Sequence, residues 1–275
     1  MRFFAGILFK LSMLVAPLLA IQPAVPLPAE SIAYRRSQLA SPDLRPENKP
    51  RSYARYDFSP LWMESNRDNG GPYGIIGLNC QRLRMKILTI ARDGADPALY
   101  YFTGKTQVAG HLSAFSSVLR LQEVHELGHL DVRVDEVVSP AKKEGIALGV
   151  YEFREDVSQL KTGVFRGVVK TNWYLDKRGR LRYDDIRLGD GYCNNQFVGA
   201  WTSYTTKKTL RCNWGDYRIP NSGNFDIGAG DFSPNPKYYA YGWQNFKEIN
   251  SGKSPVEQER ANRVWRKREN SVWWK

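Results

Sequence analysis

The chain is poor in the residues that carry thiol and metal chemistry. Its 275 residues include three cysteines and three histidines, so thiol or metal chemistry must draw on a short list of side chains. No P-loop, G-x-G-x-x-G or G-x-S-x-G motif is present, which leaves nucleotide-binding and α/β-hydrolase sites without support. No apolar stretch approaches the ~20 residues of a spanning helix, because Lys10 interrupts the N-terminal one.

The chain is rich in aromatic and basic residues. Apolar residues make up 42%, charged residues 25% and aromatic residues 13%, a composition that excludes a mainly disordered chain. The net charge of +12 indicates acidic partners or anionic surfaces. Nucleic acid is disfavoured, because basic residues alternate with acidic ones along the predicted strands.

The N-terminus has the pattern of a signal peptide. Arg2 precedes an apolar run over 11–20, and small residues that suit cleavage follow at Ala20, Ala24 and Ala29. We therefore expect 1–29 to direct export to the periplasm or the cell exterior, with an uncleaved N-terminal anchor as the alternative. The basic, proline-containing segment 30–69 is predicted to be a linker; its alternative role is a basic arm for nucleic acid or anionic lipid.

Export would place the three cysteines in an oxidising compartment, where cysteines pair. Cys193 and Cys212 are closest in sequence, and a bridge between them would contribute roughly 3 kcal/mol. A simple hairpin about 205–208 would instead place Cys212 opposite Trp201, so the bridge needs a bend near 191–195. We expect this disulfide, with Cys80 left as the odd thiol.

Hydrophobic alternation with period two dominates the middle of the chain. Leu83, Met85 and Ile87 alternate with basic residues, and similar runs follow at 99–104, 130–134, 146–155 and 164–175. Hairpins are predicted around 176–179 and 205–208. About nine strands with short turns fall between 80 and 220. The fold class is therefore all-β, an antiparallel barrel or sandwich in a domain over 70–250.

The C-terminal segment 251–275 is predicted to form an amphipathic helix. Ser254 can cap it, Pro255 suits its first turn, and Glu257 completes a capping box. Its apolar side is expected to dock on the β domain. The alternative is that this basic, tryptophan-bearing helix lies on an anionic membrane.

One motif points directly to catalysis. His125-Glu126-Leu127-Gly128-His129 resembles the HExxH stretch of zinc metallopeptidases, which implies His125 and His129 as zinc ligands and Glu126 as general base. That role needs a helix, whereas the flanking residues alternate as strands do. No third histidine follows His129. We expect a hairpin turn here and keep a zinc-dependent metallohydrolase as the alternative function.

A second candidate site lies in the run 193–235, which is rich in aromatic, Asp, Asn and Gly residues. Its side chains suit a sugar or an amphipathic ligand, because rings can stack and polar edges can hydrogen-bond. The aspartates offer oxygen ligands for Ca²⁺, without the alternation of an EF-hand loop. The predicted ligand-binding residues are Trp201, Trp214, Asp216, Tyr217, Arg218, Asp226 and Asp231.

Two resemblances accompany this run. Gly199-Ala200-Trp201 resembles the G-x-W of lipocalin-type barrels, in which a tryptophan closes one barrel end. The stretch of roughly 70–245, including YGIIGLNCQRLRMKI, resembles uncharacterised secreted bacterial β-proteins. That resemblance implies no activity. The expected function is thus non-enzymatic: an exported ligand-binding or interaction domain without a cofactor, whose partner is a glycan, a small amphipathic molecule or an anionic surface.

Overall fold

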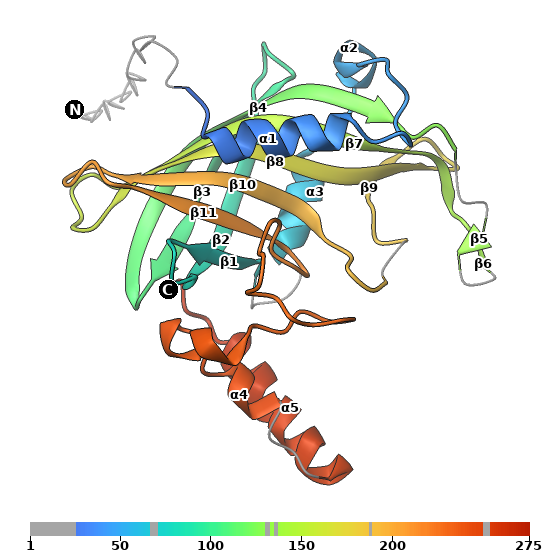
Figure 1. The fold of residues 1–275 in the computed structure, drawn as a ribbon. Coiled ribbons are helices and arrows are strands. Elements are labelled where there is room, and N and C mark those ends of the chain that lie inside the picture. Colours follow the sequence, from blue (N-terminus) through green and yellow to red (C-terminus); the bar gives the residue numbers. More distant parts are fainter. Residues whose placement is uncertain (1–25, 67–70, 130–132, 135–136, 187–188, 250–253) are drawn as a thin grey trace, which may run out of the picture.

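The computed structural model describes residues 26–66, 71–129, 133–134, 137–186, 189–249 and 254–275. Nine strands form one antiparallel sheet in the order β10-β11-β1-β2-β3-β4-β7-β8-β9, and β10 also pairs with β8. That last pairing closes every strand of the sheet except β9 into a ring (Figure 1). The predicted all-β fold is confirmed, and its architecture is a barrel and not a sandwich.

The strands follow the predicted alternation closely. They are β1 (Tyr73–Ile76), β2 (Gln81–Arg92), β3 (Leu99–Val108), β4 (His111–Glu126), β7 (Ala141–Glu155), β8 (Gly163–Asp176), β9 (Leu181–Tyr183), β10 (Asn194–Ser203) and β11 (Thr209–Asp216). The connection from β4 to β7 carries a separate small pair, β5 (Arg133–Val134) and β6 (Val137–Val138). The strand expected over 130–134 falls partly outside the described residues.

Aromatic side chains fill the barrel interior. Tyr151, Phe153, Phe197 and Trp214 are all buried, and the rings of Phe197 and Trp214 stack at 4.6 Å between centroids. A Cβ on Gly199 would lie 2.4 Å from the Tyr151 hydroxyl, so glycine at this position makes room for that ring. The middle of the barrel is therefore a packed core.

The two ends of the barrel are closed differently. At one end, which we call the turn end, neighbouring strands are joined by short connections: 77–80, 109–110, 156–162 and 204–208. At the other, the helix end, the chain before β1 enters the barrel. Phe58, Leu61 and Trp62, from α3 (Ser59–Met63) and the residue before it, join the interior core. The Trp62 indole N–H donates to the Thr171 hydroxyl at 2.9 Å.

The predicted linker is folded over its described part. It forms α1 (Ala29–Leu39), α2 (Pro50–Tyr53), α3 and the 3₁₀ turn η1 (Glu64–Asn66). Prolines that we interpreted as linker residues instead occupy the first turns of α2 and α3, where a missing N–H costs nothing. Burial against the barrel stabilises these short helices, which could not persist alone.

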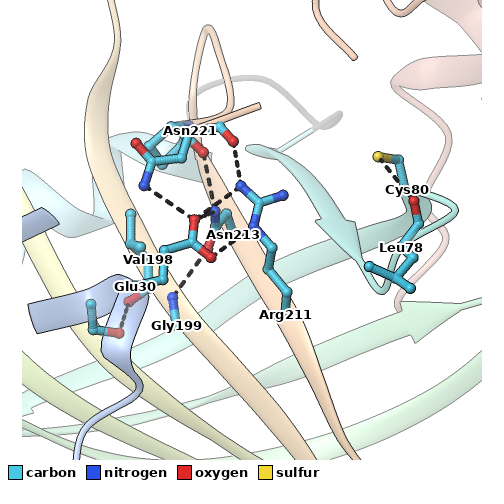
Figure 2. Close-up of polar contacts among 10 residues, drawn as sticks. Glu30, Leu78, Cys80, Val198, Gly199, Arg211, Asn213 and Asn221 are labelled. Carbon is cyan, nitrogen blue, oxygen red and sulfur yellow. Dashed lines mark hydrogen bonds and ion pairs between the residues drawn. The ribbon is translucent and has the colours of Figure 1, made fainter. Parts of the chain in front are cut away.

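Helix α1 crosses the outer face of β8 and β10 (Figure 1). Figure 2 shows how its first turn is fixed: the Glu30 carboxylate accepts hydrogen bonds from Arg211, Asn213 and Asn221. Ser31 donates to the Val198 carbonyl at 2.8 Å, and Tyr34 donates to Gln196. The helix is thus part of the folded domain, although it precedes β10 by more than 150 residues.

A C-terminal layer, residues 217–249 and α5 (Pro255–Glu269), covers the outer face of β1 and β2. It includes the 3₁₀ helix η2 (Pro236–Tyr241) and α4 (Phe246–Ile249). The predicted cap is confirmed, because Ser254 accepts from the Glu257 amide. Phe225, Trp243 and Phe246 form a second apolar cluster under this layer. No helix in the described part of the chain is long and apolar enough to span a membrane.

The basic face of β2 is covered by residues 269–274. Arg82 forms a buried ion pair with Glu269, and the Arg84 side chain donates to the Glu269 carbonyl at 2.8 Å. Arg84 lies over the Trp273 ring, and the Lys86 ammonium lies 4.3 Å from the centroid of the Trp274 ring. The polar face that the alternation predicted therefore packs against protein.

The expected disulfide is not formed, and the three cysteines are free. Cys212 pairs with Gly199 and points into the barrel, whereas the Cys193 sulfur lies beside Gly215 and donates to the Arg218 carbonyl. Three residues along a strand separate these places, a span of roughly 10 Å. A disulfide needs Cα atoms within about 7 Å. The hairpin about 205–208 is confirmed, but its register places Leu210 opposite Trp201.

Candidate functional site

A wide cleft lies at the barrel rim, where β1 begins and β11 has just ended. Its volume is about 670 Å³. One wall is the rim itself, the second is the loop 189–192 together with 230–232, and the third is α5. We call it the rim cleft. Its lining residues are Tyr73, Gly189, Asp190, Tyr192, Tyr217, Arg218, Gly230, Asp231, Phe232, Phe246, Asn262, Trp265 and Arg266.

Arg218 holds the loop that shapes one wall. Its guanidinium pairs with Asp226 at 2.6 Å and donates to the carbonyls of Gly228, Ala229 and Gly230. The other Asp226 oxygen accepts from the Gly228 and Ser233 amides, both at 3.1 Å. Because these bonds use most donors of Arg218, this residue positions the loop more than it offers itself to a ligand.

Aromatic rings supply much of the cleft surface. Tyr73 and Phe232 stack at 4.2 Å between centroids, and Tyr192 meets Tyr217 edge-on at 5.2 Å. Tyr217 is 41% exposed. The buried indole nitrogen of Trp265 has no acceptor among the described residues. These rings offer flat faces to a ligand, with hydrogen-bonding groups at their edges.

Two carboxylates stand among these rings. The side chains of Asp190 and Asp231 line the cleft and are exposed. Neither is hydrogen-bonded or ion-paired within the described part of the chain. Asn262 and Arg266 of α5 line the opposite wall. The cleft therefore presents acceptors on one side and donors on the other, between aromatic surfaces.

A smaller hollow of about 290 Å³ adjoins the cleft, and Tyr73, Tyr217, Trp265 and Arg266 line both. Asp216 lies in its wall and is buried. Its Oδ2 accepts from the Tyr183 hydroxyl at 2.9 Å and from the Asn195 amide at 2.8 Å. Its Oδ1 has no hydrogen-bond partner among the described residues.

Burial raises the pKa of Asp216 to about 7, although Ser65, Tyr183 and Asn195 oppose that shift. This carboxyl group is therefore poised to gain or lose a proton near neutral pH. Glu64 lines the same hollow, and its charge contributes to the raised pKa. The hollow combines a protonatable group with the open space that a reacting molecule needs.

No known protein family, curated protein or solved structure matches the chain. The assignment of a function therefore depends on the geometry of this site.

The structure brings together part of the predicted ligand-binding set. Tyr217, Arg218 and Asp231 line the rim cleft, Asp226 lies behind Arg218, and Asp216 lines the adjoining hollow. Two tryptophans lie elsewhere. Trp214 is buried in the barrel core, and Trp201 is at the turn end, where its indole N–H donates to Glu155. Asp216, Asp226 and Asp231 thus face different surroundings and share no common centre.

Sequence reasoning missed the other half of the cleft. Tyr73, Asp190, Tyr192 and Trp265 come from three segments, β1, the loop 189–192 and α5, which meet only in the folded domain. Among these residues, Trp265 was the easiest to predict, because it is a large aromatic residue on a helix that was expected to pack against the β domain. Nothing in the local pattern marks Tyr73, which begins a strand and turns its ring outward.

The HELGH stretch lies at the end of β4 and in the bend that follows it. His125 and Glu126 are neighbours on a strand, so their side chains point to opposite faces. The His125 Nδ1 contacts the Arg45 carbonyl at 3.1 Å, and His129 is exposed in the bend. The helical i, i+4 pairing of imidazoles that the zinc motif needs is therefore not formed here.

Glu126, the candidate base of that motif, is committed to other partners. It accepts hydrogen bonds from Tyr53 and Lys143, both at 2.7 Å, and from Lys49 at 3.1 Å. Burial alone would raise its pKa, but these bonds hold the pKa of Glu126 at about 2. Within the described ranges no group of three or more His, Cys, Asp or Glu side chains is arranged to hold a metal ion. These contacts favour a structural role for Glu126.

Proposed function

We propose that the protein is an exported binding domain that holds a carbohydrate in the rim cleft. The observation that carries this proposal is the combination of aromatic faces with two carboxylates that have no partner in the described chain, Asp190 and Asp231. Sugar rings have apolar C–H faces and a rim of hydroxyl groups, so they satisfy both kinds of surface at once.

The polar groups of the cleft favour a carbohydrate over a lipid-like ligand. An apolar molecule would cover Asp190, Asp231 and Arg266 without bonding to them, and buried polar groups without partners cost free energy. Hydroxyl groups can instead donate to the carboxylates and accept from Arg266. The balanced charge of the walls suits a neutral oligosaccharide.

A glycan array with purified protein comprising 26–275 tests the proposal, followed by calorimetry with the best oligosaccharide. Tyr217→Ala is expected to weaken binding at least tenfold, because it removes a stacking face. Tyr101→Ala is the matched control, since Tyr101 is also 41% exposed but lies on β3. Absence of any array signal, or equal losses in both variants, would overturn the proposal.

A second candidate, hydrolysis of the bound glycan, is favoured by Asp216. Its Oδ1 has no hydrogen-bond partner in the described part, and the group lies in the hollow that adjoins the cleft. A protonated Asp216 could donate to the glycosidic oxygen as that bond breaks and water attacks the anomeric carbon, with Glu64 offering the second carboxylate. Release of reducing ends that stops in Asp216→Asn would establish this activity, and binding without release would refute it.

The alternative of a zinc-dependent hydrolase can be tested directly. Metal analysis of purified protein, beside a His125→Ala/His129→Ala variant, would reveal a zinc ion that depends on HELGH. Stoichiometric zinc lost in that variant would favour the hydrolase over the binding domain.

A further inference from the structure

A second cavity lies at the turn end of the barrel, on the far side of the core from the helix end. It has a volume of about 250 Å³, somewhat below the roughly 300–1,000 Å³ of pockets for drug-sized ligands. Its walls are mostly apolar side chains on inward-facing strand positions: Ile76, Val108, Phe165, Trp201 and Leu210. We call it the turn-end pocket.

One acidic side chain stands in this apolar wall. Glu155 ends β7 and is only 6% exposed. Its Oε1 accepts from the Thr106 hydroxyl, and its Oε2 accepts from the Gly163 amide and the Trp201 indole N–H, both at 2.9 Å. Three donors from three different strands therefore fix the orientation of the carboxylate at the pocket.

All three donors are neutral. Among the described residues, no Lys, Arg or His side-chain nitrogen lies within 4.0 Å of the Glu155 carboxylate oxygens. His111 and Lys161 also line the pocket. Burial raises the pKa of Glu155 more strongly than its three hydrogen bonds and the nearby His111 lower it. A buried carboxylate without a cation is unfavourable unless something else compensates it.

The surroundings suit a cation carried on an apolar body. An ammonium group beside Glu155 would complete the missing ion pair, and the rings of Phe165 and Trp201 in the same wall can stabilise a cation through their faces. The aliphatic side chains would cover the rest of the molecule. A neutral alcohol would satisfy the shape but not the charge, and a carboxylic acid would meet repulsion.

We propose that the turn-end pocket binds a small primary amine with a compact apolar body, paired with Glu155. This site is separate from the rim cleft and does not depend on carbohydrate binding. The two proposals share no residue, so each can fail without the other.

Calorimetry with three probes of similar size tests the proposal: 2-phenylethylamine, 2-phenylethanol and 3-phenylpropanoate. At pH 7 the amine is expected to bind at least tenfold more tightly than the alcohol, and the carboxylate is expected not to bind. Equal affinity for the amine and the alcohol, or no saturable binding of the amine, would overturn the proposal.

Two variants locate the site. Glu155→Gln is expected to remove the advantage of the amine over the alcohol while the pocket keeps its shape. Leu210→Trp is expected to abolish binding of both by filling the mouth, where Leu210 is 38% exposed and its enlargement leaves Glu155 untouched. Circular dichroism confirms folding, and Tyr217→Ala in the rim cleft serves as the unaffected control. Unchanged amine binding in folded Leu210→Trp would also refute the site.

Discussion

The two ends of the barrel are closed by different kinds of structure. At the turn end, strands adjacent in sequence are joined by short turns, and the walls of the pocket there are mostly apolar. At the helix end, α3 enters from the N-terminal side, and Asn195, Thr171 and Asp216 form a buried polar network beneath it. Local sequence thus determines one end, while contacts between distant segments determine the other.

The two ends also differ in the polar side chains that they hold. The turn end is closed by the strand connections themselves, and the acid in its pocket, Glu155, is buried in a mostly apolar wall. The helix end gathers side chains from the N-terminal helices, β9, β11 and α5, and its hollow and cleft combine aromatic rings with several polar groups. The end assembled from distant segments is the one with the larger cavity and the more varied donors and acceptors.

The largest expected effect tests whether α3 is essential for closure. Trp62→Ala is expected to destabilise the protein by about 3–5 kcal/mol, because it opens a cavity among Tyr100 and Phe102 and leaves Thr171 without its donor. Urea unfolding measures the loss. Trp201→Ala at the turn end is the matched control and should cost less, since Trp201 is only partly buried. Equal losses would break the distinction between the ends.

The next effect concerns the buried acid of the helix end. Asp216 has a pKa of about 7 against an ordinary value of 3.8, so the folded state holds a proton that the unfolded chain has lost. Stability that is present below pH 4 should therefore decline as the pH rises to about 7.

Asp216→Asn should remove that decline and raise the free energy of unfolding at pH 8 by about 2–4 kcal/mol relative to the parent protein. Denaturation curves from pH 4 to pH 8 measure it. Parallel pH profiles for the two proteins would show that Asp216 ionises normally.

A smaller effect is expected where α1 attaches outside the barrel. Glu30→Gln should cost about 1–2 kcal/mol at pH 7, because the carboxylate accepts from Arg211, Asn213 and Asn221. Burial works against the charge, but these bonds lower the pKa of Glu30. The advantage of the parent protein should therefore be complete above pH 4.5 and fade at lower pH.

Denaturation at pH 7 and pH 3 tests this expectation. Glu259→Gln is the control, since Glu259 forms an exposed pair with Arg263 and should change stability little. A loss in Glu30→Gln that stays the same at pH 3 would mean that the charge does not hold α1.

The smallest expected effect is on addition of a reducing agent. Because Cys193 and Cys212 are unpaired, dithiothreitol should leave the melting temperature unchanged within about 1 °C. A bridge closing this loop would instead stabilise by roughly 3 kcal/mol. Peptide mapping that recovers a linked Cys193–Cys212 pair would contradict the prediction and would require a shift between β10 and β11.

The sequence predicted the strands well because each has one buried face, and alternation records that face directly. It could not distinguish a barrel from a sandwich, since closure depends on the single pairing of β8 with β10. Helices α2 and α3 were missed because they have only four and five residues. Such helices carry no periodic signal, and their stability comes from burial.

The candidate site was predictable only where it is local in sequence. Tyr217, Arg218 and Asp231 belong to one polar, aromatic run that sequence composition made visible. Tyr73, Tyr192 and Trp265 reach the same cleft from other elements. Trp201 lies in the same aromatic run as Tyr217, but β10 places it at the opposite end of the barrel.

The ion pair between Arg82 and Glu269 has a consequence for the order of folding. Its partners are 187 residues apart, and Glu30 meets Asn213 across 183 residues. Contacts of this span form only after both distant partners have been synthesised, and folds rich in them form slowly. As the protein is synthesised, β2 therefore emerges with its row of basic side chains uncovered. It stays so until residues 269–274 have been synthesised and dock on it.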